Sequence, residues 1–118
     1  MNTMKTMLTA CVAALALSAT ATYAAPAPFV SAAAVAAAKT PAEHEAIAKA
    51  YEDEAASLNQ KAEVHADMAK SNSGSGMKAP QMAINRHCKA IAKDYRAAAA
   101  ESAGLAALQH NLAKQAAQ

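Results

Sequence analysis

HEAIAKAYEDEAASLNQKAEVHADMAK at residues 44–70 and CKAIAKDYRAAAAESAGLAALQHNLAK at residues 88–114 are the two related stretches that decide the fold. A shift of 44 positions places the block IAKAY at 47–51 on the block IAKDY at 91–95. In each stretch apolar residues recur every three or four positions, which is the spacing of one face of an α-helix. The chain therefore contains the same amphipathic helix twice.

Local signals set the limits of these helices. Thr40 can act as N-cap, Pro41 as the first helical residue and Glu43 as the reciprocal partner in a capping box. The stretch SNSGSGMKAP combines two glycines, three serines and a proline, which is typical of a loop. A single short connection between two long helices makes an antiparallel hairpin. The predicted elements are a helix at 41–70, a loop at 71–80 and a helix at 81–115, within a domain at 40–118.

One heptad position of each predicted helix holds only alanine, which lets two helices approach closely. We name this set the alanine seam: Ala48, Ala55, Ala62, Ala69, Ala92, Ala99, Ala106 and Ala113. Glu54 and Lys61 interrupt the apolar stripe of the first helix, and Gly104 in the second helix is expected to mark a close contact.

Alanine supplies 38 of the 118 residues, and the chain has one Phe and no Trp. Alanine favours helix but buries little apolar area, so one hairpin alone has a thin core. We expect an all-α protein whose antiparallel two-helix hairpins pair as a homodimeric four-helix bundle.

The N-terminus has the features of a secretory signal peptide at residues 1–24. A positive charge precedes an apolar run from Met7 to Ala19, and small residues follow. Cleavage is expected after Ala21 or, by preference, after Ala24. The apolar run is too short to span a membrane, so no stable membrane insertion is expected after cleavage. The mature protein is then periplasmic or secreted, with a flexible Ala- and Pro-rich leader at 25–39.

The chain has two cysteines, and processing would remove Cys11 and leave Cys88 alone. The alternative, a lipid attached to Cys11, would leave almost no apolar run before the cysteine. A single thiol cannot form an internal disulfide, so Cys88 is buried, free, metal-bound or paired between chains. The formal net charge is only +2, with two arginines, so no nucleic-acid partner is expected.

The four histidines fall near the two ends of the predicted hairpin. Folding the hairpin about its loop pairs residues whose numbers add up to about 152, which brings His65 to His87 and His44 to His110. His, Cys and Met side chains are the ligands that Cu(I) and Zn(II) prefer. The alternative is that the histidines are ordinary polar or helix-end residues and that Cys88 is an inert part of the core. The candidate metal ligands are His65, His87, Cys88, Met68, His44 and His110, with copper expected first and zinc second.

Motifs for other chemistry are absent from the sequence. There is no Glu-x-x-His pair for a di-iron bundle, no Cys-x-x-Cys-His for haem and no glycine-rich phosphate loop. The acidic run EDE at 52–54 has no second carboxylate cluster and is expected to be a solvated helix face. We therefore expect no enzyme activity.

The pattern of the two helices resembles a group of small, exported, alanine-rich bacterial proteins. The shared positions in this chain are His44, Ile47, Tyr51, His65, Met68, His87, Cys88, Ile91, Tyr95, Leu105 and His110. The resemblance covers residues 40–115 and implies a helical hairpin, and it implies no activity. This chain departs from the pattern at Gln109, directly before the last histidine.

The sequence leaves two functions open. The first is a periplasmic hairpin that binds copper or another soft metal through the side chains at its ends. The second is a structural or protein-interaction module of the envelope, a coiled-coil stress protein that binds no metal and offers its apolar face to an unknown protein partner.

Overall fold

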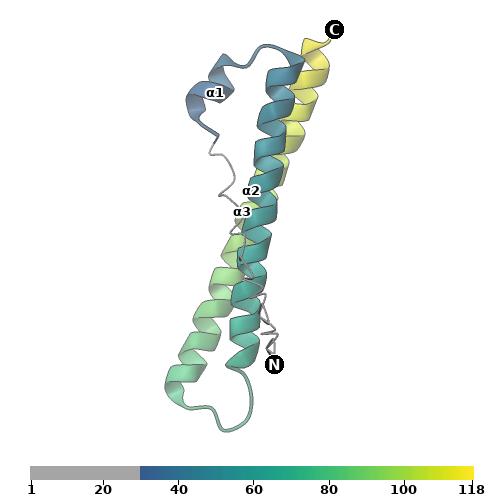
Figure 1. The fold of residues 1–118 in the computed structure, drawn as a ribbon. Helices are drawn as coiled ribbons and strands as arrows, with labels where there is room; N and C mark the ends of the chain where they lie inside the picture. Colours follow the sequence, from purple (N-terminus) through teal and green to yellow (C-terminus); the bar gives the residue numbers. More distant parts are fainter. Residues whose placement is uncertain (1–29) are drawn as a thin grey trace, which may run out of the picture.

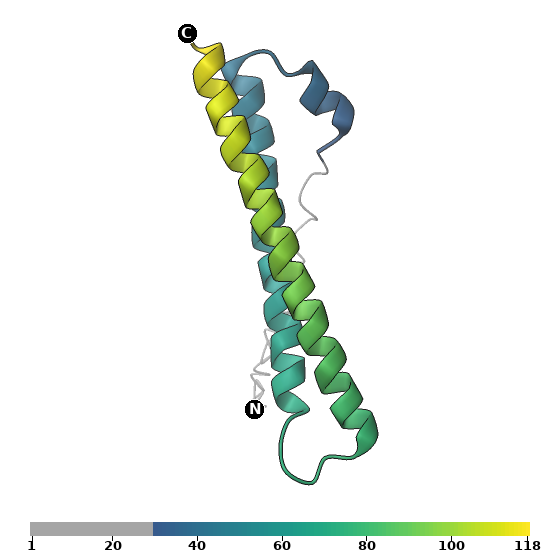
Figure 2. The same ribbon diagram turned by 180° about the vertical axis from the view of Figure 1, so that it is seen from behind.

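The computed structural model describes residues 30–118, which form α1 (Ala32–Ala37), α2 (Pro41–Ser71) and α3 (Ala79–Ala116). Helices α2 and α3 run antiparallel and side by side along most of their length (Figure 1). Helix α1 lies beside the start of α2, on the side away from α3, as both views show (Figure 2). No strand occurs in the part of the chain that the structure describes, and the predicted all-α hairpin is confirmed.

The predicted N-terminal segments fall mostly outside the described residues. This holds for the signal peptide at 1–24, with Cys11, and for the first part of the predicted leader at 25–39. The rest of that leader contains the short helix α1, which begins where the hydroxyl of Ser31 accepts a hydrogen bond from the backbone N–H of Ala34 at 3.1 Å.

Helix α2 begins at the predicted residue because the capping box is formed. The hydroxyl of Thr40 accepts from the backbone N–H of Glu43 at 3.3 Å. The Glu43 carboxylate in turn accepts from the backbone N–H groups of Lys39 at 2.8 Å and Thr40 at 2.9 Å. These bonds, from Lys39 first and Thr40 second, hold the pKa of Glu43 below its ordinary value.

The loop between the long helices spans residues 72–78, slightly less than predicted. The side-chain amide of Asn72 donates to the carbonyl of Met68 at 2.8 Å and closes α2. Gly74 and Gly76 have φ angles of 146° and 85°, a region of backbone conformation that favours glycine. The loop then leads into α3, where the side chain of Gln81 accepts from the backbone N–H of Lys78 at 2.8 Å.

The alanine seam forms the centre of the hairpin. Every one of its eight alanines is buried, with at most 8 % of its surface exposed. Methyl groups at this position allow the helix axes to approach to about 8 Å, the lower end of the usual range. No large side chain is fully buried among the described residues, so the core is as thin as the composition predicted.

The expected close contact at Gly104 is wrong. Gly104 lies on an exposed part of α3, and a Cβ atom added there would meet nothing within 4 Å. It lies two residues from Ser102 and two from Ala106, on the side of α3 away from α2, which explains why no neighbour requires a glycine.

None of the described helices is long and apolar enough to cross a membrane.

Candidate functional site

A second column of side chains borders the alanine seam. It consists of His44, Tyr51, Leu58 and His65 on α2, and of Cys88, Tyr95, Ser102 and Gln109 on α3, each spaced by seven residues. At the open end of the hairpin Nδ1 of His44 donates to the side-chain oxygen of Gln109 at 2.8 Å, and both side chains are buried. The two buried polar groups therefore satisfy one another, as the energetics of burial require.

The next row outward on each helix makes a surface, exposed except at the buried Ile47, that we name the apolar face. It comprises Ile47, Glu54, Lys61 and Met68 on α2, and Ile84, Ile91, Ala98, Leu105 and Leu112 on α3. Two contacts show that the rows lie on the same side of the hairpin. The hydroxyl of Ser102 donates to the Glu54 carboxylate at 3.2 Å. Leu58 of α2 and Ile91 of α3 also line one shallow hollow.

Large side chains on the apolar face remain open to solvent. Met68, Ile84, Ile91, Leu105 and Leu112 each expose between 38 and 44 % of their surface. The buried columns between the two rows are narrow, so a single hairpin has nothing to cover these side chains. Large exposed apolar patches are typical of surfaces that contact another molecule.

The opposite side of the hairpin, which we name the polar face, carries ion pairs between the helices. The ring nitrogens of His110 lie 2.8 Å from a carboxylate oxygen of Glu45 and 2.9 Å from one of Glu52. Arg96 donates to Glu63 at 2.8 Å. Both nitrogens of an imidazole can donate only when the ring is charged. The hydrogen bond to Glu52, followed by that to Glu45, raises the pKa of His110 above its ordinary value.

The histidines predicted to pair do not bond to one another. His44 bonds to Gln109, and His110 bonds to glutamates on the other face of the hairpin. His65 stacks on Tyr95 with ring centroids 5.7 Å apart, whereas His87 is exposed on the surface of α3. Both members of the second predicted pair still lie at the open end, but on opposite sides of the seam.

The direction of helical side chains accounts for the partner of His65. Every Cα–Cβ bond leans toward the N-terminus of its own helix, so side chains at the same level of antiparallel helices lean in opposite directions. His65 leans away from the loop and reaches Tyr95, while Cys88 leans toward the loop. Cross-helix contacts consequently join residues whose numbers add up to more than the predicted value of about 152, as for His65 with Tyr95.

The candidate metal ligands fall into buried and exposed groups. Cys88 is buried with a free thiol, and Nδ1 of His65 is buried without a hydrogen-bond partner. His87 and Met68 are exposed. Across residues 30–118 no three side chains of the types His, Cys, Asp and Glu gather closely enough to hold a metal ion. The two glutamates around His110 do not converge, because they contact opposite edges of the ring.

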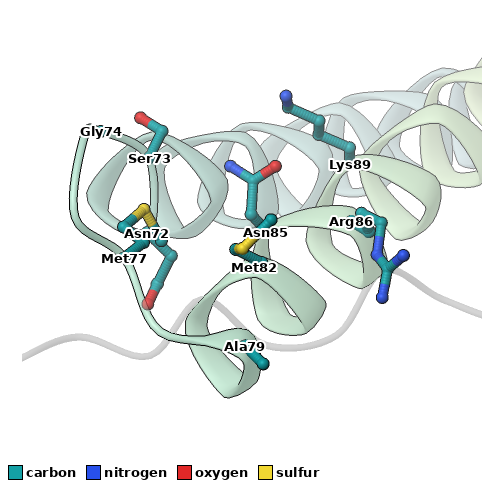
Figure 3. Close-up of a pocket in the computed structure, with 9 residues that line it drawn as sticks. All are labelled: Asn72, Ser73, Gly74, Met77, Ala79, Met82, Asn85, Arg86 and Lys89. Atoms are coloured by element: carbon teal, nitrogen blue, oxygen red, sulfur yellow. The ribbon is translucent and has the colours of Figure 1, made fainter.

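A separate hollow lies at the loop end. Figure 3 shows the residues that line it, among them Met77 and Met82 from the loop and the start of α3, with Arg86 and Lys89 farther along the helix. Asn85 stands in the seam position on α3, and its amide donates to the carbonyl of Ala69 at 2.6 Å. That bond ties the loop end of the two helices together.

Sequence reasoning missed the carboxylates around His110. Glu45 and Glu52 are spaced by one heptad and lie next to the seam position, on the side away from His44. This spacing was the available signal, because it places both carboxylates on one edge of α2 facing α3.

Comparison with protein-family models, with curated proteins and with solved structures finds no match to this chain, so its function is inferred from the residues and contacts described above.

Proposed function

We propose that this protein is an exported, non-enzymatic helical-hairpin module that pairs with a second copy through its apolar face to form a four-helix bundle. The observation that supports this proposal is the row of exposed Ile84, Ile91, Leu105 and Leu112 side chains, spaced by multiples of seven residues on α3, beside the exposed Met68 on α2. Burial of this surface would supply the core that the alanine seam lacks.

The separation of charge between the two faces supports the same function. The ion pairs made by Arg96 and His110 lie on the polar face, which is therefore suited to water. The apolar face has only two charged residues, Glu54 and Lys61, along the entire length of α2. A hairpin with one charged, solvated side and one apolar side is expected to associate through the apolar side.

Export is part of the proposal and rests on the N-terminal sequence. The positive charge, the apolar run from Met7 to Ala19 and the small residues that follow are typical of a signal peptide. Mass spectrometry of the protein recovered from its host would locate the N-terminus near Ala25 if the proposal is right.

A pair of glutamate substitutions tests the assembly. Leu105→Glu places a charge in the middle of the apolar face, and we expect the dimer to dissociate at least tenfold more readily. Ala100→Glu adds the same charge at an exposed position on the other side of α3 and should leave the assembly unchanged. Sedimentation equilibrium measures both variants, and equal dissociation constants for them would contradict the role of the apolar face.

A second candidate function, binding of copper or zinc, is favoured by one observation. Nδ1 of His65 is buried without a partner, and Cys88 is a buried free thiol on the facing column of α3. A rotation of either side chain could bring an imidazole nitrogen and a thiolate toward one soft metal ion. His87 or Met68, which also lie toward the loop end, would complete such a site.

A metal titration decides between the two functions. In the metal-binding case the purified protein takes up one equivalent of Cu(I) or Zn(II) in competition with a chelator, and His65→Ala and Cys88→Ala each abolish uptake. His87→Ala tests whether the exposed histidine takes part. If neither metal binds stoichiometrically, the metal-binding candidate is wrong and the assembly proposal is unaffected.

A further inference from the structure

The two charged residues on the apolar face, Glu54 and Lys61, indicate how two copies pair. Glu54 and Lys61 are spaced by one heptad in the row that begins at Ile47 and ends at Met68. Glu54 accepts a hydrogen bond from Ser102, and the ammonium group of Lys61 lies 5.9 Å from the centre of the Tyr95 ring. Within residues 30–118 neither charge has an ion-pair partner. Burial of the apolar face would require such partners, because an unpaired buried charge is costly.

We propose, on the basis of the self-assembly above, that two hairpins pair antiparallel about a two-fold axis at the level of Leu58, so that Glu54 of each copy meets Lys61 of the other. In this arrangement α2 packs on α2 and α3 packs on α3. The axis lies midway between the two charged residues, so a single rotation forms two equivalent ion pairs. The same rotation places Ile47 of one copy opposite Met68 of the other.

The row on α3 fits the same axis. Residues at the level of Leu58 on α2 face the region of Tyr95 on α3, as the hollow that both line shows. Rotation about this level places Ile91 of one copy beside Ala98 of the other. The small side chain of Ala98, which interrupts the Ile and Leu row, leaves room for that isoleucine.

The alternative two-fold axis, parallel to the helices, satisfies the charges less well. It would pack α2 of one copy on α3 of the other at the same level of the hairpin. Glu54 would then face the region of Ala98 and Glu101, where the apolar side of α3 offers no cation. Lys61 would face the region of Asp94, but Glu54 would lie near another acid. The antiparallel pairing gives both charges a partner and is therefore favoured.

The size of the apolar face is sufficient for a stable pair. A helix of 31 residues is about 45 Å long at 1.5 Å per residue, and two adjacent helices are about 20 Å wide. The projected face is thus about 900 Å² per copy, compared with about 800 Å² per partner in a standard specific interface. A second copy of the chain is therefore an adequate occupant.

Exchange of the two charges tests this arrangement. Glu54→Lys alone and Lys61→Glu alone each turn two attractive pairs into two repulsive ones, and we expect a dissociation constant at least tenfold higher for each. An equimolar mixture of the two single variants should form heterodimers with close to wild-type affinity, because each lysine then meets a glutamate. Native mass spectrometry separates homodimers from heterodimers, and Lys93→Glu, an exposed charge reversal outside the apolar face, is the matched control.

The outcomes separate this inference from the proposed function. Weakened single variants together with preferential heterodimers support the antiparallel pairing. If both single variants dimerise as tightly as the wild type, the antiparallel pairing is wrong and self-assembly still stands. The same holds if the mixture of the two single variants does not regain wild-type affinity. A wild-type protein that stays monomeric in the same experiment overturns both. Circular dichroism verifies that the variants keep their helices, which is expected because both positions are exposed.

Discussion

Replacement of a seam alanine by leucine should destabilise the hairpin far more than the same change next to the seam. Ala62 has no exposed surface and lies in the column that faces the seam alanines of α3, among them Ala92 with 2 % exposed. Ala62→Leu inserts three additional carbon atoms between helices that approach to about 8 Å. Extra carbon atoms in a packed core cost about 1–3 kcal/mol, so we expect about 2 kcal/mol of lost stability.

The control for this change is Ala56→Leu on the exposed side of α2. Leucine and alanine have similar helix propensities, so the control should change stability by less than about 0.5 kcal/mol. At about 4–8 °C per kcal/mol for a domain of this size, Ala62→Leu should melt about 8–16 °C below Ala56→Leu. Thermal unfolding followed by circular dichroism at equal protein concentration measures the difference. Equal melting temperatures for the two variants would refute close packing at the alanine seam.

Three further changes have defined outcomes in urea unfolding. Thr40→Ala removes the N-cap of α2 and should cost about 1 kcal/mol, whereas Thr40→Ser should retain most of the stability. Gly104→Ala should stabilise α3 by about 0.5–1 kcal/mol, since no neighbour obstructs a methyl group there, and a loss of stability would contradict the contacts described. The pKa of His110 is raised in the fold, so its contribution is full below the unfolded pKa of about 6.5 and is lost as the pH rises through the folded value. The urea midpoint should therefore fall more on going from about pH 6 to about pH 8 in the wild type than in His110→Gln, and parallel curves would argue against the bonds to Glu45 and Glu52.

The backbone of this fold was largely predictable because its signals are local or periodic. The capping box at Thr40 is readable from four consecutive residues, and α2 begins where it predicts. The alanine seam is visible as a column of one residue type, and all of its members are buried. The alanine side chain is a single methyl group, so a column of alanines fills the space between two helices only when the helices pack closely.

The side-chain partners were less predictable because they depend on the side of the helix that each residue faces and on the direction in which its side chain leans. Counting from the loop gave the correct ends of the hairpin but the wrong neighbours for His44 and His65. The partner of His65 is offset by eight residues from the counted one, because His65 leans away from the loop and because His87 lies on the exposed side of α3, whereas Tyr95 lies in the column that borders the seam. Sequence spacing alone does not contain this offset.

The position of the apolar face was also not predictable from sequence spacing. Ile84, Ile91, Leu105 and Leu112 are spaced for one side of a helix, but sequence periodicity cannot show whether that side faces α2 or solvent. The seam alanines and the column with Cys88 occupy the contact with α2, which leaves the larger residues outside it. In this protein the small residues form the interior and the large apolar residues of α3 remain exposed.

The molar mass of the wild-type protein in solution tests this account most directly. Light scattering on the protein purified at micromolar concentration gives that mass, and mass spectrometry of the same sample gives the mass of one chain. Pairing through the apolar face predicts a ratio of two, reduced toward one by Leu105→Glu and unchanged by Ala100→Glu. A ratio of one for the wild type would contradict the account.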